Sequence, residues 1–123
     1  MPTFAVVQNL TRPLGKAPRI RLCSSFGSKL RGLMFRRSIG PDEGILLMGS
    51  RDQRLDAGIH MLFVPFDLAV FWISSRMEVV DKVLARSWHP AYLPSIPSQY
   101  VLELHPSLHE AYRVGDRVEI IHA

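Results

Sequence analysis

The sequence contains a single cysteine, Cys23, which excludes an intramolecular disulfide. Basic and apolar residues alternate from Arg19 to Cys23, as is typical of a half-buried strand. A reactive thiolate needs an electropositive, partly exposed setting and a nearby base. The flanking arginines supply only the first of these, so we interpret Cys23 as a small residue of a half-buried strand.

Long hydrophobic runs are also missing. No stretch approaches the roughly 20 apolar residues of a membrane-spanning helix. The first residues show neither the basic segment nor the apolar run of a signal peptide. We therefore expect a cytoplasmic protein without a membrane segment. The length of 123 residues fits a single domain over 1–123, and 47% hydrophobic residues suffice for its core.

The common catalytic signatures are absent. There is no nucleophile elbow, no phosphate-binding glycine loop, no HExxH zinc motif and no dinucleotide fingerprint. His105 and His109 have a spacing that can place two ligands on one helix face, but Pro106 follows His105 and no further ligands lie nearby. We therefore predict no metal site and no cofactor. Catalysis of another kind stays open.

Charge is divided unevenly along the chain. Residues 1–54 hold ten Lys and Arg against three Asp and Glu, whereas residues 55–123 hold five against eight. Either the two halves interleave and their charges meet across one domain, or the basic half binds an anionic partner such as nucleic acid. The sequence has no lysine-rich tail and no aromatic-and-glycine pattern of a single-strand binder. We therefore favour the first interpretation and do not expect nucleic acid.

Short runs of β-forming residues recur between turn signals. We predict strands at residues 3–8, 19–23, 44–48, 59–64, 68–73, 78–86, 100–104 and 118–121. The window from 59 to 73 is the most apolar part of the chain, and we expect central strands buried on both faces there. Residues 49–58 are polar and predict an exposed connection. Residues 87–98, with Trp88 and Tyr92, are irregular and form either a pocket mouth or a pinned loop.

Two short helices complete the predicted fold. The first follows Ser24 and Ser25, with apolar residues at helical spacing, namely Phe26, Leu30, Leu33 and Met34. The second opens at Pro106, where Ser107 and Glu110 have the spacing of a capping box. The connections are too short for repeated strand–helix–strand crossovers. The fold class is therefore α+β, mainly β: a small curled or barrel-like mixed or antiparallel sheet with two short helices.

Five motifs in a fixed order carry a family resemblance. They are Arg31-Gly32-Leu33-Met34-Phe35-Arg36, Gly44-Ile45-Leu46-Leu47, Ile59-His60-Met61-Leu62-Phe63, Val101-Leu102-Glu103-Leu104 and Gly115-Asp116-Arg117-Val118. From about residue 19 to residue 121 the chain resembles the bacterial and archaeal family named domain of unknown function 192. The resemblance implies a small, mostly β domain with a helix carrying the Arg-Gly-Leu-Met motif. It implies no established activity.

The chain departs from the family pattern at one carboxylate. Proteins of the family usually have proline, an apolar residue and aspartate where this chain has Asp67, Leu68 and Ala69. Positions two apart on a strand share a face and lie about 7 Å apart. Asp67 either replaces the carboxylate displaced from position 69, or that role is lost here.

Arg31 and Arg36 are candidate ligand-binding residues, because a guanidinium grips carboxylate or phosphate with two hydrogen bonds. Alternatively, Arg31 pairs with Glu103 or Asp116 and locks a helix to the sheet, while Arg36 is solvated. His60 lies in an apolar run and is either a hydrogen-bonded core residue or a general base oriented by Asp67.

These residues favour a non-catalytic binding module for a small anionic molecule or peptide, with polar contacts from Arg31, Arg36, His60, Asp67 and Glu103. One alternative is a hydrolase-type enzyme that uses His60 and Asp67 as an acid–base pair, with Arg31 as an anion clamp. A second alternative is a nucleic-acid accessory protein that uses the basic N-terminal half. The patterns assign no oligomeric state.

Overall fold

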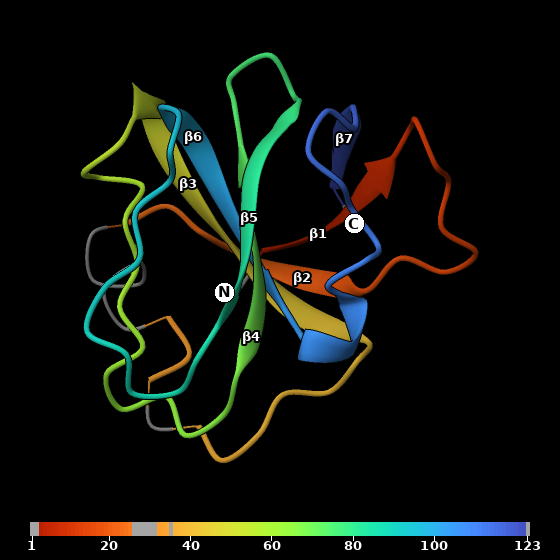
Figure 1. Cartoon of the computed structure of the whole chain (residues 1–123). Coiled ribbons are helices and arrows are strands. Elements are labelled where there is room, and N and C mark those ends of the chain that lie inside the picture. Colours follow the sequence, from red (N-terminus) through yellow and green to blue (C-terminus); the bar gives the residue numbers. More distant parts are fainter. Residues whose placement is uncertain (1–2, 26–31, 35, 123) are drawn as a thin grey trace.

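A computed structural model describes residues 3–25, 32–34 and 36–122, and Figure 1 shows the whole chain. In the described part the elements are seven strands and one 3-10 helix. They are β1 (Phe4–Asn9), β2 (Arg19–Cys23), β3 (Glu43–Gln53), β4 (Leu68–Ile73), β5 (Val79–Ala85), β6 (Ser98–Leu104), η1 (Pro106–Leu108) and β7 (Val118–His122).

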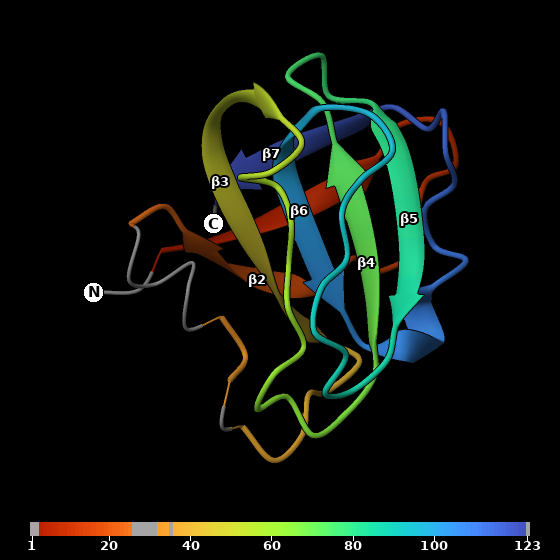
Figure 2. The ribbon, with the colours of Figure 1, turned by 60° about the vertical axis from the view of Figure 1, so that its left-hand side comes forward.

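The strands form one mixed sheet in the order β5-β4-β6-β3-β2-β1-β7. β2 and β3 are parallel, and all other neighbours are antiparallel. The two ends of the sheet meet, because the N–H of Val79 donates to the carbonyl of Asp116 at 2.8 Å and that of Val118 to Met77 at 2.9 Å. The predicted curled, mainly β sheet is therefore confirmed, and Figures 1 and 2 show its curvature.

The prediction of two short helices is wrong for the residues that the structure describes. The segment after Pro106 makes only the single 3-10 turn η1, and its cap is His105, whose Nδ1 accepts from the Ser107 N–H at 3.1 Å. Ser107 lies inside that turn, so it does not head a capping box. Most of the other predicted helix, residues 26–31 and 35, lies outside the described residues. Gly32 has φ +46°, which a right-handed helix does not accommodate.

Residues 59–64 do not form the predicted strand. Ile59 makes one isolated bridge to Tyr92, and Phe63 has φ +61°, a left-handed conformation that ends any extended run. The prediction of a central strand buried on both faces is confirmed for β4, whose six residues are all buried. β3 extends to Gln53, five residues into the stretch predicted as a connection.

Alternate residues of the central strands feed two separate cores. Ala69, Phe71 and Ile73 pack with residues of β1, β2 and β7 in an inner core within the curl of the sheet. Leu68, Val70 and Trp72 pack on the opposite face with residues of the connecting segments in an outer core. Both faces of β4 are therefore covered. Cys23 lies on the predicted strand, but it is fully buried in the outer core and not half-buried.

Two connecting segments, residues 54–67 and 86–97, cover the outer core side by side, as Figure 2 shows. We call them the loop layer. Ile59 and Tyr92 exchange backbone hydrogen bonds of 2.9 and 2.8 Å, so the two segments brace each other. The indole N–H of Trp72 on β4 donates to the carbonyl of Ala57 at 2.7 Å, which ties the layer to the sheet.

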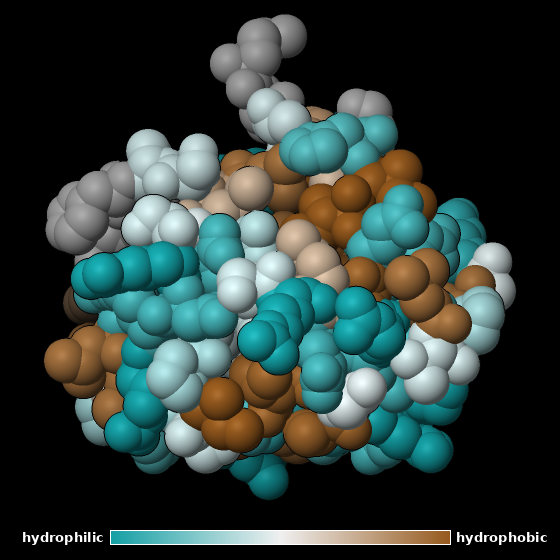
Figure 3. Space-filling view, turned by 90° about the horizontal axis from the view of Figure 1, so that it is seen from above, coloured by the Kyte–Doolittle hydropathy of each residue, from teal (hydrophilic) through white to brown (hydrophobic). Residues whose placement is uncertain are grey.

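The described surface carries scattered apolar residues. The large exposed ones are Leu10, Leu55, Leu62, Phe63, Trp88, Leu93, Ile96, Val114 and Ile121. Seen from above in Figure 3, brown apolar areas are broken up by teal hydrophilic side chains. Among the described residues, no helix is long and apolar enough to cross a membrane.

Candidate functional site

A cavity of about 390 Å³ lies between the loop layer and the strands β3 and β6. This volume falls in the range of small-molecule sites. Its apolar lining comes from Leu33, Met34, Leu47, Ala57, Ile59, Val64 and Val101. Its polar lining comes from Ser50, Arg51, Gln53, Asp56, His60, Ser98, Gln99 and Glu103.

An irregularity in β3 shapes one wall of the cavity. Regular pairing of β3 with β6 stops at Met48, opposite Tyr100, and resumes at Gln53, opposite Ser98. The extra residues bulge, and the Gln99 side chain holds them by donating from Nε2 to the Gly49 carbonyl at 3.0 Å. A Cβ at Gly49 would lie 2.8 Å from the Gln99 carbonyl oxygen, so the close approach requires glycine.

Glu103 supplies the buried charge of the cavity wall. Its side chain is 7% exposed. Burial raises the pKa of Glu103 to about 7. Within the described chain, no hydrogen bond or ion pair reaches its carboxyl group. Near neutral pH the group can therefore either donate a hydrogen bond or hold a cation.

Ser98 is the second unpartnered polar group of this wall. The residue is 1% exposed, and its Oγ has no hydrogen-bond partner in the part of the chain that the structure describes. Ser98 and Glu103 stand at the start and near the end of β6. At about 3.4 Å per residue they lie roughly 17 Å apart along the strand. Val101 lies between them and makes the wall apolar.

The structure places His60 at the cavity and Asp67 away from it. His60 is partly exposed and lines the cavity, and its Nδ1 accepts from the Leu62 N–H at 3.2 Å. The Asp67 carboxylate instead accepts from the Ser87 N–H at 2.9 Å and from Arg86 at 3.2 Å. No hydrogen bond joins His60 to Asp67 in the described chain, so the acid–base pair has no geometric support.

Position 69 lies in a different environment from the Asp67 carboxylate. Ala69 is fully buried in the inner core. The carboxylate of Asp67 bridges to the residues after β5 and fastens the loop layer beside the start of β4. The contacts of Asp67 therefore hold two connecting segments together.

The predicted arginines contribute little that can be described at this site. Arg31 lies outside the described residues. Arg36 is exposed, does not line the cavity and forms an ion pair with Glu43. Arg21 reaches the neighbouring turn, where its Nη2 donates to the Gly32 carbonyl at 3.3 Å.

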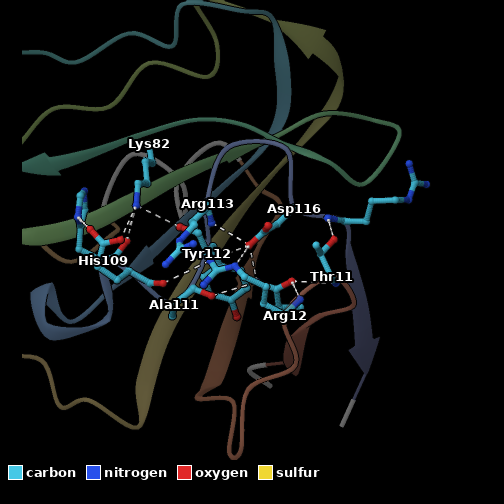
Figure 4. Close-up of polar contacts among 11 residues, drawn as sticks. Thr11, Arg12, Lys82, His109, Ala111, Tyr112, Arg113 and Asp116 are labelled. Atoms are coloured by element: carbon cyan, nitrogen blue, oxygen red, sulfur yellow. Dashed lines mark hydrogen bonds and ion pairs between the residues drawn. The ribbon is translucent and has the colours of Figure 1, made fainter.

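Asp116, one predicted partner of Arg31, is held by other residues, as Figure 4 shows. Its Oδ2 accepts from Asn9 at 2.7 Å, from Arg12 at 2.9 Å and from the Arg113 N–H at 2.9 Å. Burial opposes ionisation of Asp116, but these hydrogen bonds outweigh it and lower the pKa of its carboxyl group. This network ties the end of β1 to the turn before β7.

Neither aromatic residue of the predicted binding loop lines the cavity. Tyr92 stacks on His89 with ring centroids 4.2 Å apart, and its hydroxyl oxygen accepts from the Arg86 N–H at 2.9 Å. Trp88 is exposed and meets the Phe63 ring edge to face at 5.1 Å. Tyr92 also packs against the outer core, which favours the interpretation as a pinned loop.

Sequence reasoning missed Ser98, Gln99, Arg51 and Asp56. A carboxylate within an apolar strand marks Glu103, but a serine or glutamine at the start of the same strand carries no comparable signal. Gly49, at the start of the bulge, was the one residue that could have indicated that β3 approaches β6 closely there. Among the described residues, no group of three or more His, Cys, Asp or Glu is placed to hold a metal ion.

Two solved structures share this fold. A protein of unknown function from Novosphingobium aromaticivorans superposes with a TM-score of 0.81 at 21% identity, covering 97% of this chain and 84% of that one. A candidate transcription regulator from Sinorhizobium meliloti also gives a TM-score of 0.81, at 20% identity, covering 98% and 94%. At these identities the likeness concerns the fold alone.

Archaeal relatives extend the similarity to the sequence. A UPF0127 protein of Pyrococcus furiosus is 33% identical over 115 residues, which cover 90% of this chain and 94% of the relative. A UPF0127 protein of Thermococcus kodakarensis is 31% identical over 85 residues, which cover 69% of this chain and 52% of the relative. The model of the family domain of unknown function 192, described as "Uncharacterized ACR", matches residues 8–120. The chain therefore belongs to this family, as its motifs indicate.

Proposed function

We propose that the protein is a non-catalytic binding module that holds a small ligand in the cavity between the sheet and the loop layer. One observation carries the proposal. Glu103, buried and without a partner in the described chain, lines a cavity with a largely apolar wall. Leaving a buried carboxyl unpaired costs stability, and a ligand that pairs with it recovers it.

The described lining changes the expected chemistry of the ligand. The sequence favoured an anionic ligand because of Arg31, and that expectation stays a prediction, since Arg31 lies outside the described residues. Of the described charged groups that line the cavity, Arg51 and Asp56 are exposed, and only Glu103 is buried. We therefore propose a ligand with an apolar body and a polar end. The cytoplasmic location, the single domain and the absence of a cofactor also stay predictions.

A thermal-shift screen of small amphipathic molecules tests the proposal. A ligand that binds the folded state raises its stability by mass action, by about 2.7 kcal/mol at a concentration of 100 Kd. Leu47→Phe puts a bulkier ring into the apolar lining, narrows the cavity and should weaken the shift. Ile120→Phe, on β7 and away from the cavity, is the matched control and should keep it.

Two outcomes contradict the proposal. In the first, no compound of the screen stabilises the unaltered protein. In the second, Leu47→Phe binds as tightly as Ile120→Phe while both variants remain folded.

A further inference from the structure

We propose that the ligand is an organic amine, whose ammonium group docks on the Glu103 carboxylate and whose apolar chain runs along β6 towards Ser98. This inference rests on the proposed function and names the ligand class of the same cavity.

The distribution of charge around the cavity supports a cation at Glu103. Arg51 and Asp56 are exposed, so water solvates both. His60 is partly exposed, and its Nδ1 is occupied by the Leu62 N–H. None of these described lining groups forms an ion pair with Glu103. The buried carboxyl is thus a charge site whose counterion the described chain does not supply.

Physical chemistry then selects the sign of the ligand. Moving a carboxylate out of water costs several kcal/mol, and an opposite charge in contact with it offsets much of that cost. A neutral ligand leaves Glu103 to take up a proton, and an anionic group would be repelled by its ionised form. The pKa of about 7 means that an approaching ammonium can shift the group fully to its ionised form at little cost.

The shape of the cavity supports the apolar chain. Between Glu103 and the start of β6, the lining includes the apolar side chains of Val101 on β6 and Leu47 on β3, with Gln99 beyond them. Ile59 and Val64 face it from the loop layer. Over the roughly 17 Å of strand between Glu103 and Ser98, this lining suits an alkyl chain.

Three probes with the same alkyl chain separate the possibilities: octylamine, octanol and octanoate. Titration calorimetry at pH 8 measures each affinity. For the unaltered protein we expect octylamine to bind at least tenfold more tightly than octanol, and octanoate to bind most weakly. In Glu103→Gln, which keeps the size of the side chain, octylamine should lose at least tenfold in affinity, whereas octanol should change by less than twofold.

Control variants separate the buried carboxyl from other acids. Glu119→Gln, at an exposed position on β7, should leave all three affinities unchanged. Asp42→Asn, at an exposed position outside the cavity lining, should likewise leave them unchanged.

Several results would overturn the inference. If octanoate or octanol binds at least as tightly as octylamine and Leu47→Phe weakens that binding, the amine is wrong and the proposed function stands. If octylamine binds folded Glu103→Gln undiminished, the ammonium does not dock on Glu103. If neither these probes nor any compound of the wider screen binds, the inference and the proposed function both fail.

Discussion

Glu103 couples the stability of the folded protein to pH. Burial raises its pKa from 4.5 to about 7, so the folded state holds this proton more tightly than the unfolded state does. Because the folded state binds more protons, stability falls as pH rises from about 4.5 through 7. Each tenfold change in proton affinity corresponds to about 1.4 kcal/mol. Above pH 7, burial of the charged Glu103 therefore lowers the free energy of unfolding by roughly 3 kcal/mol.

We therefore expect Glu103→Gln to be more stable than the unaltered protein above pH 7, by up to roughly 3 kcal/mol. The amide keeps the size of the side chain but carries no charge to desolvate. The advantage should shrink as pH falls and disappear near pH 4. Urea unfolding at pH 4, 6 and 8 measures it. A difference that does not change with pH would contradict the assigned burial of a charge.

The ionised Asp116 carboxylate should have the opposite effect on the pH dependence of stability. Because its pKa is lowered in the folded state, it stabilises the fold above the ordinary carboxyl pKa, and this stabilisation is lost as pH falls. Asp116→Ala removes the acceptor shared by Asn9, Arg12 and the Arg113 N–H, and we expect a loss of about 2–4 kcal/mol at pH 7. Thermal and urea unfolding check this. Glu119→Ala, at an exposed position, is the control and should change stability by less than about 0.5 kcal/mol.

At the scale of elements, the loop layer depends on a few fixed points on the sheet. The hydrogen bond from Trp72 to the Ala57 carbonyl is buried and joins β4 to the segment that lines the cavity. Trp72→Phe removes the donor, keeps an aromatic ring and should cost about 1–3 kcal/mol. Amide exchange of Gly58, Ile59 and Met61 should accelerate, because their hydrogen bonds lie within this layer.

A substitution on the opposite face of β4 is the control for that result. Phe71 belongs to the inner core, so Phe71→Leu should lower global stability without selectively accelerating exchange in the loop layer. Equal acceleration in both variants would show that Trp72 does not hold the layer locally.

The same elements show what a sequence can predict. β2 and β4 follow from alternating or continuous apolar patterns, and both were placed at their observed bounds. Residues 59–64 look like β4 in composition, yet they are apolar because they cover the sheet. Their failure to extend depends on the backbone at Phe63. Glu103 was identifiable as a carboxyl among apolar residues, whereas the cavity beside it depends on a bulge and two distant loops, which no local pattern encodes.

At the scale of the whole molecule, the curl of the sheet is closed by a short turn. The N–H of Gly115 donates to the Val79 carbonyl at 2.8 Å, which joins this turn to the other end of the sheet. Gly115 has φ +97°, and a Cβ there would meet nothing within 4 Å. A side chain at position 115 would therefore meet no steric clash, and its cost in stability would come from backbone strain alone.

We expect Gly115→Ala to lower the free energy of unfolding by about 1–2 kcal/mol, with its effect centred on the closure. Urea unfolding measures the loss, and amide exchange at Val79 and Val118 should report local loosening. Gly15→Ala offers a comparison, because a Cβ there also meets nothing within 4 Å and its φ carries no left-handed strain. Equal effects of the two substitutions would contradict the assigned strain.

The alternation of β6 between the two cores also bears on how the chain avoids misfolding. Leu102 and Leu104 enter the inner core, while Val101 and Glu103 face the cavity. A slip of β6 by one residue against its neighbours would exchange these faces. The carboxyl of Glu103 would then enter a core built of aliphatic and aromatic side chains, at a cost of several kcal/mol. The group that we propose binds the ligand thus also specifies the register in which the central strands assemble.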